Sequence, residues 1–293
     1  MRYGAIDIGS NAVRLLIAEV NKEKVPFKFK KEALIRVPLR LGDDAFIHHH
    51  ISDAKFDNMV KTMQAFRNLM DVYRVSDYMA CATSAMREAD NGDEIVVACG
   101  KVGIDINIID GGKEAKIIYS SQLRDNIDVN KVYLYIDVGG GSTEISLFAN
   151  AEVVASKSFN LGTIRILDNQ DSPEIWQELK EWVRGVTKPY KNIYGIGTGG
   201  NMNKLSRFAN EKEDKPISFA KLKAIYDYLS SYSLKDRIHV LGLKQDRADV
   251  IIPAAEIFLT IMKVGQLKNI VAPRVGLVDG IIQTLIDREL KEE

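Results

Sequence analysis

The sequence lacks the marks of several large classes of protein. It has only two cysteines, Cys81 and Cys99, and neither lies in a CxxC pair, so no disulfide framework is expected. No long apolar run is free of charged residues, so no membrane-spanning helix is expected either. The 40 basic and 40 acidic residues cancel, and no global field would attract nucleic acid. An anionic substrate would therefore need a local basic groove.

No secretory leader is expected at the N-terminus either. The N-terminal stretch reads MRYGAIDIGSN and reaches the charged Asp7 too early for the apolar core of a secretory signal peptide. The small number of cysteines suits a reducing compartment. Together these features predict a cytoplasmic protein that binds neither nucleic acid nor membranes.

The most informative part of the chain reads YLYIDVGGGSTEISLF. Its β-forming residues alternate on both sides of Gly139, Gly140 and Gly141, which predicts a β-hairpin. Glycines let the backbone approach a ligand closely, and successive N–H groups in such a turn form an anion site. The flanking carboxylates of Asp137 and Glu144 would repel a phosphate unless a hard cation such as Mg²⁺ sat between them. The stretch predicts a phosphate and metal pocket, with an ordinary hairpin and solvated acids as the alternative.

The N-terminus repeats part of this motif. The segments Ile6–Gly9 and Ile136–Gly139 both read I-D-[IV]-G. Such a repeat predicts two duplicated halves, each opening with a phosphate-type hairpin, that face each other across a cleft. Chance recurrence of a short motif in a β-rich chain is the alternative.

Three further motifs each allow two interpretations. Arg87 follows a predicted strand and the hydroxyl pair Thr83–Ser84, so it suits either a phosphate or a surface ion pair. The run His48–His50 is assigned to an exposed loop, because three adjacent histidines cannot all turn to one metal ion. Residues 195–200 match the dinucleotide pattern GxGxxG, but no acidic residue follows at the expected distance. A second glycine loop at the phosphate site is the favoured interpretation.

Strand and helix patterns alternate along the chain, which predicts an α/β protein. A turn is predicted at Asp43–Asp44 and a helix end at Asn91–Gly92. Strands are predicted over 78–82, 104–109, 153–159 and 267–271, and helices from 52, from 114, around 175–182, and over 218–243, 247–259 and 276–288.

Taken together, the motifs resemble those of the exopolyphosphatase and guanosine pentaphosphate phosphatase (Ppx/GppA) family, and the resemblance covers nearly the whole chain. The matching segments are Ala5–Asn11, Ala82–Ala89 with Asn91–Gly92, Gly111–Lys116, Ile136–Glu144, Gly197–Gly200 and Arg247–Pro253. One departure is Val278, where the family often has an arginine in G-L-R-[ED]-G, so any phosphate contact of that arginine is in doubt.

The resemblance implies the fold of the sugar kinase–Hsp70–actin superfamily, with two ribonuclease-H-like (actin-like ATPase) domains facing each other across a cleft. The expected first domain is 1–118, joined by a terminal helix at about 281–293, and the second is 126–280. A polar turn at 126–130 is the expected link. The chain looks like a short, two-domain member of the family.

The resemblance also implies an enzyme, a Mg²⁺-dependent exopolyphosphatase that releases orthophosphate from the end of inorganic polyphosphate. Glu114 is the implied catalytic base, and Asp7, Asp137 and Glu144 are the expected metal ligands. The expected phosphate-binding residues are Ser10, Asn11, Arg87, Gly139, Gly140, Gly141, Ser142, Thr143 and Gly199. A basic groove is expected to contain Arg87 and, in addition, Arg14, Arg40 and Arg165.

Three alternatives to this function remain open. The first is hydrolysis of pppGpp at its 5′ end, because the same site would cut the same bond. The second is an ATP-dependent small-molecule kinase of the same superfamily, and the third is a polyphosphate- or nucleotide-binding regulator without turnover. A homodimer is expected from the family alone.

Overall fold

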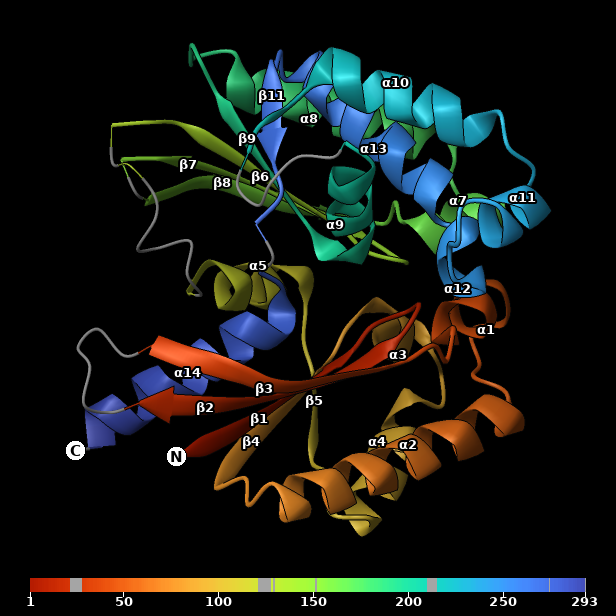
Figure 1. The fold of residues 1–293 in the computed structure, drawn as a ribbon, viewed down its shortest axis with the longest axis vertical. Helices are drawn as coiled ribbons and strands as arrows, with labels where there is room; N and C mark the ends of the chain where they lie inside the picture. Colours follow the sequence, from red (N-terminus) through yellow and green to blue (C-terminus); the bar gives the residue numbers. More distant parts are fainter. Residues whose placement is uncertain are drawn as a thin grey trace. The chain divides into compact units, whose positions relative to one another are not determined.

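Figure 1 shows the computed structural model, which describes residues 1–21, 28–120, 128, 130–150, 152–209, 215–273 and 275–292. The chain divides into two compact units. Unit 1 contains Met1–Asp125 and Val275–Glu293, and unit 2 contains Asn126–Arg274. Each unit has its own mixed β-sheet, and the units are described separately.

Unit 1 is built on a five-stranded sheet with the order β3-β2-β1-β4-β5. Its strands are β1 (Arg2–Ile8), β2 (Val13–Asn21), β3 (Lys28–Val37), β4 (Asp77–Ala82) and β5 (Ile106–Ile108). The first three strands pair antiparallel, and β1, β4 and β5 pair parallel. Every residue of β1 after Arg2 is buried, as expected for a central strand that is covered on both faces.

Helices cover this sheet and include the last helix of the chain. They are α1 (Leu41–His48), α2 (Asp53–Val72), α3 (Ser84–Glu88), α4 (Gly92–Lys101), α5 (Gly111–Ser120) and α14 (Leu277–Glu292). Helix α14 packs against β1, β4 and α5. A Cβ atom on Gly280 would lie 2.1 Å from the carbonyl oxygen of Ile117, so only glycine allows α14 to cross α5 this closely.

A buried ion pair joins α14 to β3. Asp279 is 3% exposed, and its Oδ1 lies 2.5 Å from Nζ of Lys31, which is much more exposed. The N–H of Gly276 donates to the other carboxylate oxygen at 2.9 Å. Burial raises the pKa of Asp279 above its usual range, although Lys31 opposes the shift. The ionised carboxylate therefore costs stability at neutral pH, a cost that falls as the pH drops through the raised pKa.

Because Asp279 is buried and Lys31 is much more exposed, we expect the two residues to differ in how far their replacement changes stability. In Lys31→Met the buried carboxylate loses its partner, and we expect the free energy of unfolding to fall by about 1–3 kcal/mol. In Asp279→Asn the buried charge disappears, the amide oxygen still accepts from Gly276, and we expect a loss below about 1 kcal/mol. Urea denaturation of both variants measures the difference, and a larger loss in Asp279→Asn would contradict the argument.

Unit 2 repeats the sheet of unit 1. Its strands are β6 (Tyr133–Val138), β7 (Thr143–Ala149), β8 (Glu152–Phe159), β9 (Tyr194–Thr198), β10 (Ile217–Ser218) and β11 (Asn269–Val271). They lie in the order β10-β11-β9-β6-β7-β8, with β6, β7 and β8 antiparallel and β6, β9 and β11 parallel. Three antiparallel strands followed by two parallel ones occur in both units, so the predicted internal repeat is confirmed.

The apolar helix α13 is the centre of the core of unit 2. The helices of this unit are α7 (Thr163–Leu167), α8 (Pro173–Thr187), α9 (Gly199–Phe208), α10 (Phe219–Ser230), α11 (Leu234–His239), α12 (Gln245–Ala248) and α13 (Ile251–Val264). Helix α13 packs against α8, α9, α10 and β6 (Figure 1). Its buried side chains, such as Phe258 and Ile261, belong to the core cluster. Each large apolar side chain buried in this way contributes about 1.5–3 kcal/mol.

Two expectations about local structure in unit 1 are wrong. The predicted turn at Asp43–Asp44 lies inside α1, where both carboxylates sit in the first turn and stabilise the N-terminal end of the helix. His48 is the last residue of that helix, His49 and His50 follow it, and all three are exposed, as the prediction of an exposed loop required. The pair Asn91–Gly92 begins α4 instead of ending a helix. A Cβ atom on Gly92 would lie 2.3 Å from the carbonyl oxygen of Met86, which explains the glycine.

In unit 2 the expected second glycine loop is a strand and a helix start. Gly195 and Gly197 lie within β9, and Gly199 begins α9 with a positive φ of 90°. The predicted link at 126–130 falls mostly outside the described residues. Among the described residues, no helix is long and apolar enough to cross a membrane.

Candidate active site

The turn between the first two strands has the same construction in both units. In unit 1 the N–H of Gly9 donates to the carbonyl oxygen of Ala12 at 3.2 Å. In unit 2 the N–H of Gly139 donates to the carbonyl oxygen of Ser142 at 2.9 Å. The strands bring Asp7 and Asp137 to equivalent places, each next to the last residue of its strand. The I-D-[IV]-G repeat is therefore a structural repeat of a turn preceded by an aspartate.

The carbonyl oxygens of the turn in unit 2 are occupied by the segment that opens α7. The N–H of Thr163 donates to the carbonyl oxygen of Gly139 at 3.0 Å, and the N–H of Ile164 donates to that of Gly140 at 2.8 Å. Nε of Arg165 donates to the carbonyl oxygen of Gly141 at 2.7 Å. Within the described part of the chain, the N–H groups of Gly140, Gly141 and Ser142 donate to no acceptor. Three successive N–H groups without acceptors, two of them on buried residues, form a concave site for an anion.

Arg165 has a different role from the one expected. It was predicted to line a basic groove, but it is only 8% exposed and its Nε holds the carbonyl oxygen of Gly141. Two more of the arginines predicted in the groove are paired with acids, Arg14 with Asp7 and Arg40 with Asp43. The sequence signal that could have identified Arg165 is its place just after N-L-G-T, at the end of the third strand of the repeat.

Two carboxylates of unit 2 lie on one face of the sheet beside this turn. Asp137 and Glu144 are cross-strand partners in β6 and β7, an arrangement that places Cβ atoms about 5 Å apart. Glu144 is 3% exposed, and it accepts a hydrogen bond from the hydroxyl of Ser158 at 2.8 Å. A Cβ atom on Gly199 would lie 2.9 Å from Oδ1 of Asp137, so this carboxylate rests against the start of α9.

The side chains beside this turn include suitable ligands for Mg²⁺ but do not form a complete metal site by themselves. Mg²⁺ is commonly held by one or two carboxylates together with substrate phosphates and water. Asp137 and Glu144 supply two oxygen-donating side chains next to the anion site. Among the described residues, no group of three or more histidine, cysteine or acidic side chains is placed to hold a metal ion. The roles of these residues as metal ligands stay predictions.

The remaining residues predicted to bind phosphate in unit 2 serve the turn in different ways. Ser142 closes it. Thr143 is the first residue of β7, fully buried, and its hydroxyl donates to the carbonyl oxygen of Leu161 at 2.5 Å. Thr143 therefore fixes the strand to the segment before α7.

In unit 1, Asp7 is buried and paired with a cation. It is 4% exposed and forms an ion pair with Arg14, its cross-strand partner on β2. The hydroxyl of Ser10 lies 2.9 Å from the hydroxyl of Ser84, the first residue of α3. The carbonyl oxygen of Asn11 accepts from the N–H of Arg40 at 3.1 Å. The turn of unit 1 is thus joined to both α3 and α1.

Asp7 and Glu114 both lie close enough to Cys81 to influence the charge on its thiol. Cys81 is the neighbour of Asp7 in the parallel pairing of β1 with β4. Burial raises the pKa of the Cys81 thiol to about 12, and the carboxylates of Asp7 and Glu114 both add to the rise while Lys113 opposes it. The predicted base and the predicted metal ligand of unit 1 therefore both lie in the surroundings of Cys81, in the first turn of α5 and near the end of β1 respectively.

Glu114 occupies the first turn of a well-capped helix. Its N–H donates to the carbonyl oxygen of Asp110 at 2.9 Å. The Asp110 carboxylate accepts the N–H of Lys113 at 2.8 Å, which holds the pKa of Asp110 below its usual range. The side chain of Glu114 itself is half-buried. The start of α5 therefore keeps its shape without relying on Glu114 as a cap.

Arg87 lies beside the same loop. Its Nη1 donates to the carbonyl oxygen of Ile109 at 2.7 Å, and the side chain is exposed. Among the described residues it forms no ion pair with a carboxylate, in contrast to the surface ion pair considered from the sequence. A guanidinium has five N–H donors, so most of them remain for a ligand.

The repeated sheet, with a glycine turn next to an aspartate in each copy, is that of the two-domain actin-like fold. Residues 18–289 match the Ppx/GppA phosphatase family. The chain belongs to the Ppx/GppA phosphatase family. A crystal structure of an exopolyphosphatase from Cytophaga hutchinsonii covers 98% of both chains with a TM-score of 0.86 at 21% identity, a likeness of fold. The predicted family and fold class are therefore confirmed.

Curated relatives carry several activities in their names. A bifunctional 3-dehydroquinate synthase/phosphatase of Fusobacterium nucleatum is 31% identical over 85% of this chain, which spans 41% of that protein. Exopolyphosphatase 1 of Mycobacterium tuberculosis is 23% identical over 99% of this chain and 89% of its own length. A guanosine-5′-triphosphate,3′-diphosphate pyrophosphatase of Aliivibrio fischeri is 23% identical over 99% of this chain and 60% of its own length.

Proposed function

We propose that the protein is an exopolyphosphatase, a Mg²⁺-dependent hydrolase that removes the terminal phosphate of inorganic polyphosphate. The observation that carries the proposal is the turn of unit 2, where three successive N–H groups find no acceptor among the described residues and lie next to two carboxylates. Membership of the family and a relative named exopolyphosphatase that matches nearly the whole chain support it. Phosphoryl transfer asks a protein mainly for positioning and for neutralisation of charge, and these residues suit both tasks.

The residues divide these tasks among them. The N–H groups of Gly140, Gly141 and Ser142 would bind phosphate oxygens, and the guanidinium of Arg87 would neutralise phosphate charge. Glu114 would orient the attacking water and accept its proton. Asp137 and Glu144 would hold Mg²⁺, which supplies positive charge to the phosphate oxygens when bound.

The metal role predicts a shift in the Mg²⁺ requirement of one variant. In Asp137→Asn we expect the Mg²⁺ concentration for half-maximal phosphate release to rise about tenfold or more, because a neutral amide binds a hard cation more weakly than a carboxylate does. The matched control is Asp227→Asn, which removes an exposed carboxylate of α10 that pairs with Lys223. Its Mg²⁺ titration should match the wild type. An unchanged titration for Asp137→Asn would place the metal elsewhere.

Hydrolysis of pppGpp is the second candidate. It would use the same turn and the same carboxylates, because the bond cut is also a phosphoanhydride, and a relative named for this activity matches nearly the whole chain. Parallel phosphate-release assays with long polyphosphate, pppGpp and ATP separate the two. Preferential release from polyphosphate, with shortening of the remaining chain, supports the exopolyphosphatase. Release from pppGpp alone would favour the alternative, and release from none would leave a binding protein.

Assembly and location remain expectations from the family resemblance. We propose a homodimer in the cytoplasm. Light scattering on the purified protein tests the first part, and a mass of about 33 kDa, that of the single chain, would contradict it.

A further inference from the structure

A basic cavity lies at the other end of the sheet of unit 2 from the glycine turn. It has a volume of about 580 Å³ and is lined by residues around the ends of α8 and α13 and the start of β9. An adjoining cavity of about 500 Å³ shares Arg184, Val264 and Gln266 with it. Volumes of this order suit small-molecule ligands. We call the two together the α8/α13 cavity.

The cavity is distinct from the candidate active site. Tyr194, which lines it, is the first residue of β9, and Thr198, the cross-strand partner of Asp137, is the last. Four residue steps along a strand span about 13 Å. The cavity therefore lies at the N-terminal ends of the parallel strands, whereas the glycine turn lies at their C-terminal ends.

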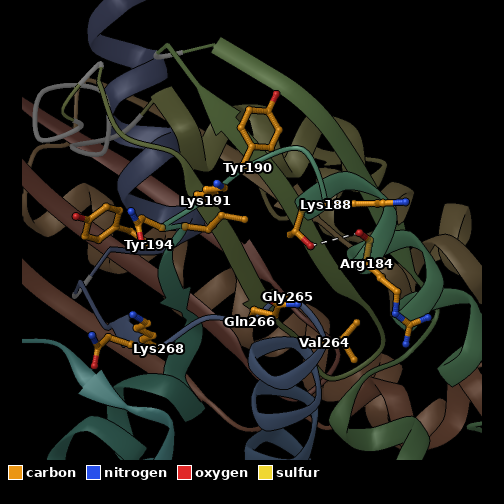
Figure 2. Close-up of a pocket in the computed structure, with 13 residues that line it drawn as sticks. Arg184, Lys188, Tyr190, Lys191, Tyr194, Val264, Gly265, Gln266 and Lys268 are labelled. Carbon is orange, nitrogen blue, oxygen red and sulfur yellow. Dashed lines mark hydrogen bonds between the residues drawn. The ribbon is translucent and has the colours of Figure 1, made fainter.

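All the charged side chains in its lining are cations. The larger cavity is lined by Arg184, Lys188, Lys191 and Lys268, and the smaller one by Lys180 and Lys263. Among the described residues, no acidic side chain belongs to either lining. Figure 2 shows Arg184 and Lys188 on one side of the larger cavity and Lys191 and Lys268 on the other. All of these lysines except the half-buried Lys180 are exposed, so their ammonium groups can turn toward a ligand.

Helix ends explain only a part of this charge. Arg184 and Lys263 lie in the last turns of α8 and α13, where cations favour the negative end of the helix dipole. Two helix ends amount to about one negative charge in total, against the six cations of the two linings. Lys191 and Lys268 belong to no helix. A large positive excess therefore remains.

The aromatic side chains argue against a nucleobase as the ligand. The ring of Tyr194 already contacts the ring of Tyr133 at 5.8 Å and lies 5.2 Å from Nζ of Lys131. Tyr190 is partly buried against the core. Both rings therefore already have packing partners, and the feature that distinguishes the lining is its positive charge, spread over two adjoining spaces.

We propose that the α8/α13 cavity is a second anion site that binds a linear oligophosphate, a segment of a polyphosphate chain held away from the glycine turn. Lysine ammonium groups act as point charges for phosphate, and several of them along two adjoining spaces match an elongated anion better than a single phosphate. The proposal rests on the proposed function for the identity of the ligand. Its consequence is tighter binding of long chains without any change in the chemical step.

A triple charge-removal variant tests the site by binding alone. The variant is Lys188→Gln, Lys191→Gln and Lys268→Gln, and the matched control removes three exposed lysines outside both linings, Lys215→Gln, Lys235→Gln and Lys244→Gln. Calorimetric titration with long-chain polyphosphate in EDTA prevents Mg²⁺-dependent turnover. We expect the affinity of the cavity variant to fall about tenfold and that of the control less than twofold. The titrations are repeated at several salt concentrations. For the cavity variant, the slope of log K (the binding constant) against log[salt] should be shallower than that of the wild type by about two, the value for three lost phosphate contacts on a single strand.

The outcomes separate the site from the proposed function. Equal losses in the two variants, or no loss in the cavity variant, would overturn the site. In Mg²⁺, the cavity variant should show a raised KM for long polyphosphate with an unchanged kcat, and an unchanged KM for tripolyphosphate. If the wild type hydrolyses no polyphosphate but the cavity variant still loses binding, the proposed function fails and the site stands. Should the triple variant melt early, the single Lys191→Gln and Lys268→Gln variants replace it, each expected to weaken binding about twofold.

Discussion

In the Glu114→Gln variant we expect phosphate release to fall by about 10²–10⁴-fold, the usual contribution of a positioned general base. The amide keeps the size of the side chain but cannot accept a proton. Substrate binding should be kept or become tighter, because a negative charge close to a polyanion has been removed. Glu114 lies in the first turn of α5, where the Asp110 carboxylate accepts the N–H of Lys113, and its charge reaches Cys81, the neighbour of Asp7 in the sheet.

A purely structural role for Glu114 predicts a different result. An acid in the first turn of a helix stabilises the N-terminal end by about 0.3–1 kcal/mol, and its loss would lower stability with nearly normal turnover. Glu94→Gln is the matched control, because Glu94 is exposed in the first turn of α4 in the same unit. Phosphate release, polyphosphate affinity and melting temperature are measured for both variants. Near-wild-type turnover in Glu114→Gln would rule this residue out as the base.

The sequence predicted the parts of the molecule that are encoded over short distances. Alternation around Gly139–Gly141 was enough for the hairpin, and the shared I-D-[IV]-G motif was enough for the repeat of the sheet. The motifs also identified the family, which the comparisons confirm. These features depend on neighbours in the chain, so pattern and propensity suffice for them.

The features that the sequence did not predict depend on contacts between distant segments. Arg165 was expected in a basic groove, and only the packing of α7 onto the turn shows that its Nε donates to the carbonyl oxygen of Gly141. Gly92 looked like a helix terminator, although the carbonyl of Met86 is what excludes a side chain there. The α8/α13 cavity gathers residues from two segments, 180–194 and 260–269, each unremarkable by itself. No local pattern records such contacts.

In the Gly162→Ala variant we expect phosphate release to fall by about 10²-fold or more, because the new methyl group would displace the glycine turn of unit 2. A Cβ atom on Gly162 would lie 2.3 Å from the carbonyl oxygen of Gly140 and 2.6 Å from the carbonyl carbon of Gly141. Gly162 has an extended backbone that alanine also adopts, so the conflict is with the turn and not with its own φ. A displacement of about 1 Å in groups that position a reacting phosphate is enough for a loss of this size.

Gly185→Ala separates this effect from the general cost of replacing a glycine. Gly185 lies inside α8 with no atom within 4 Å of the added Cβ, so we expect this control to gain about 0.5–1 kcal/mol of stability and keep full activity. Gly162→Ala should lose about 1–3 kcal/mol from the clash, yet remain folded at 25 °C. Phosphate release, binding of tripolyphosphate in EDTA and thermal melting are compared for the two. If Gly162→Ala is folded and active, the N–H groups of Gly140, Gly141 and Ser142 do not form the phosphate site, because their positions would have changed without consequence.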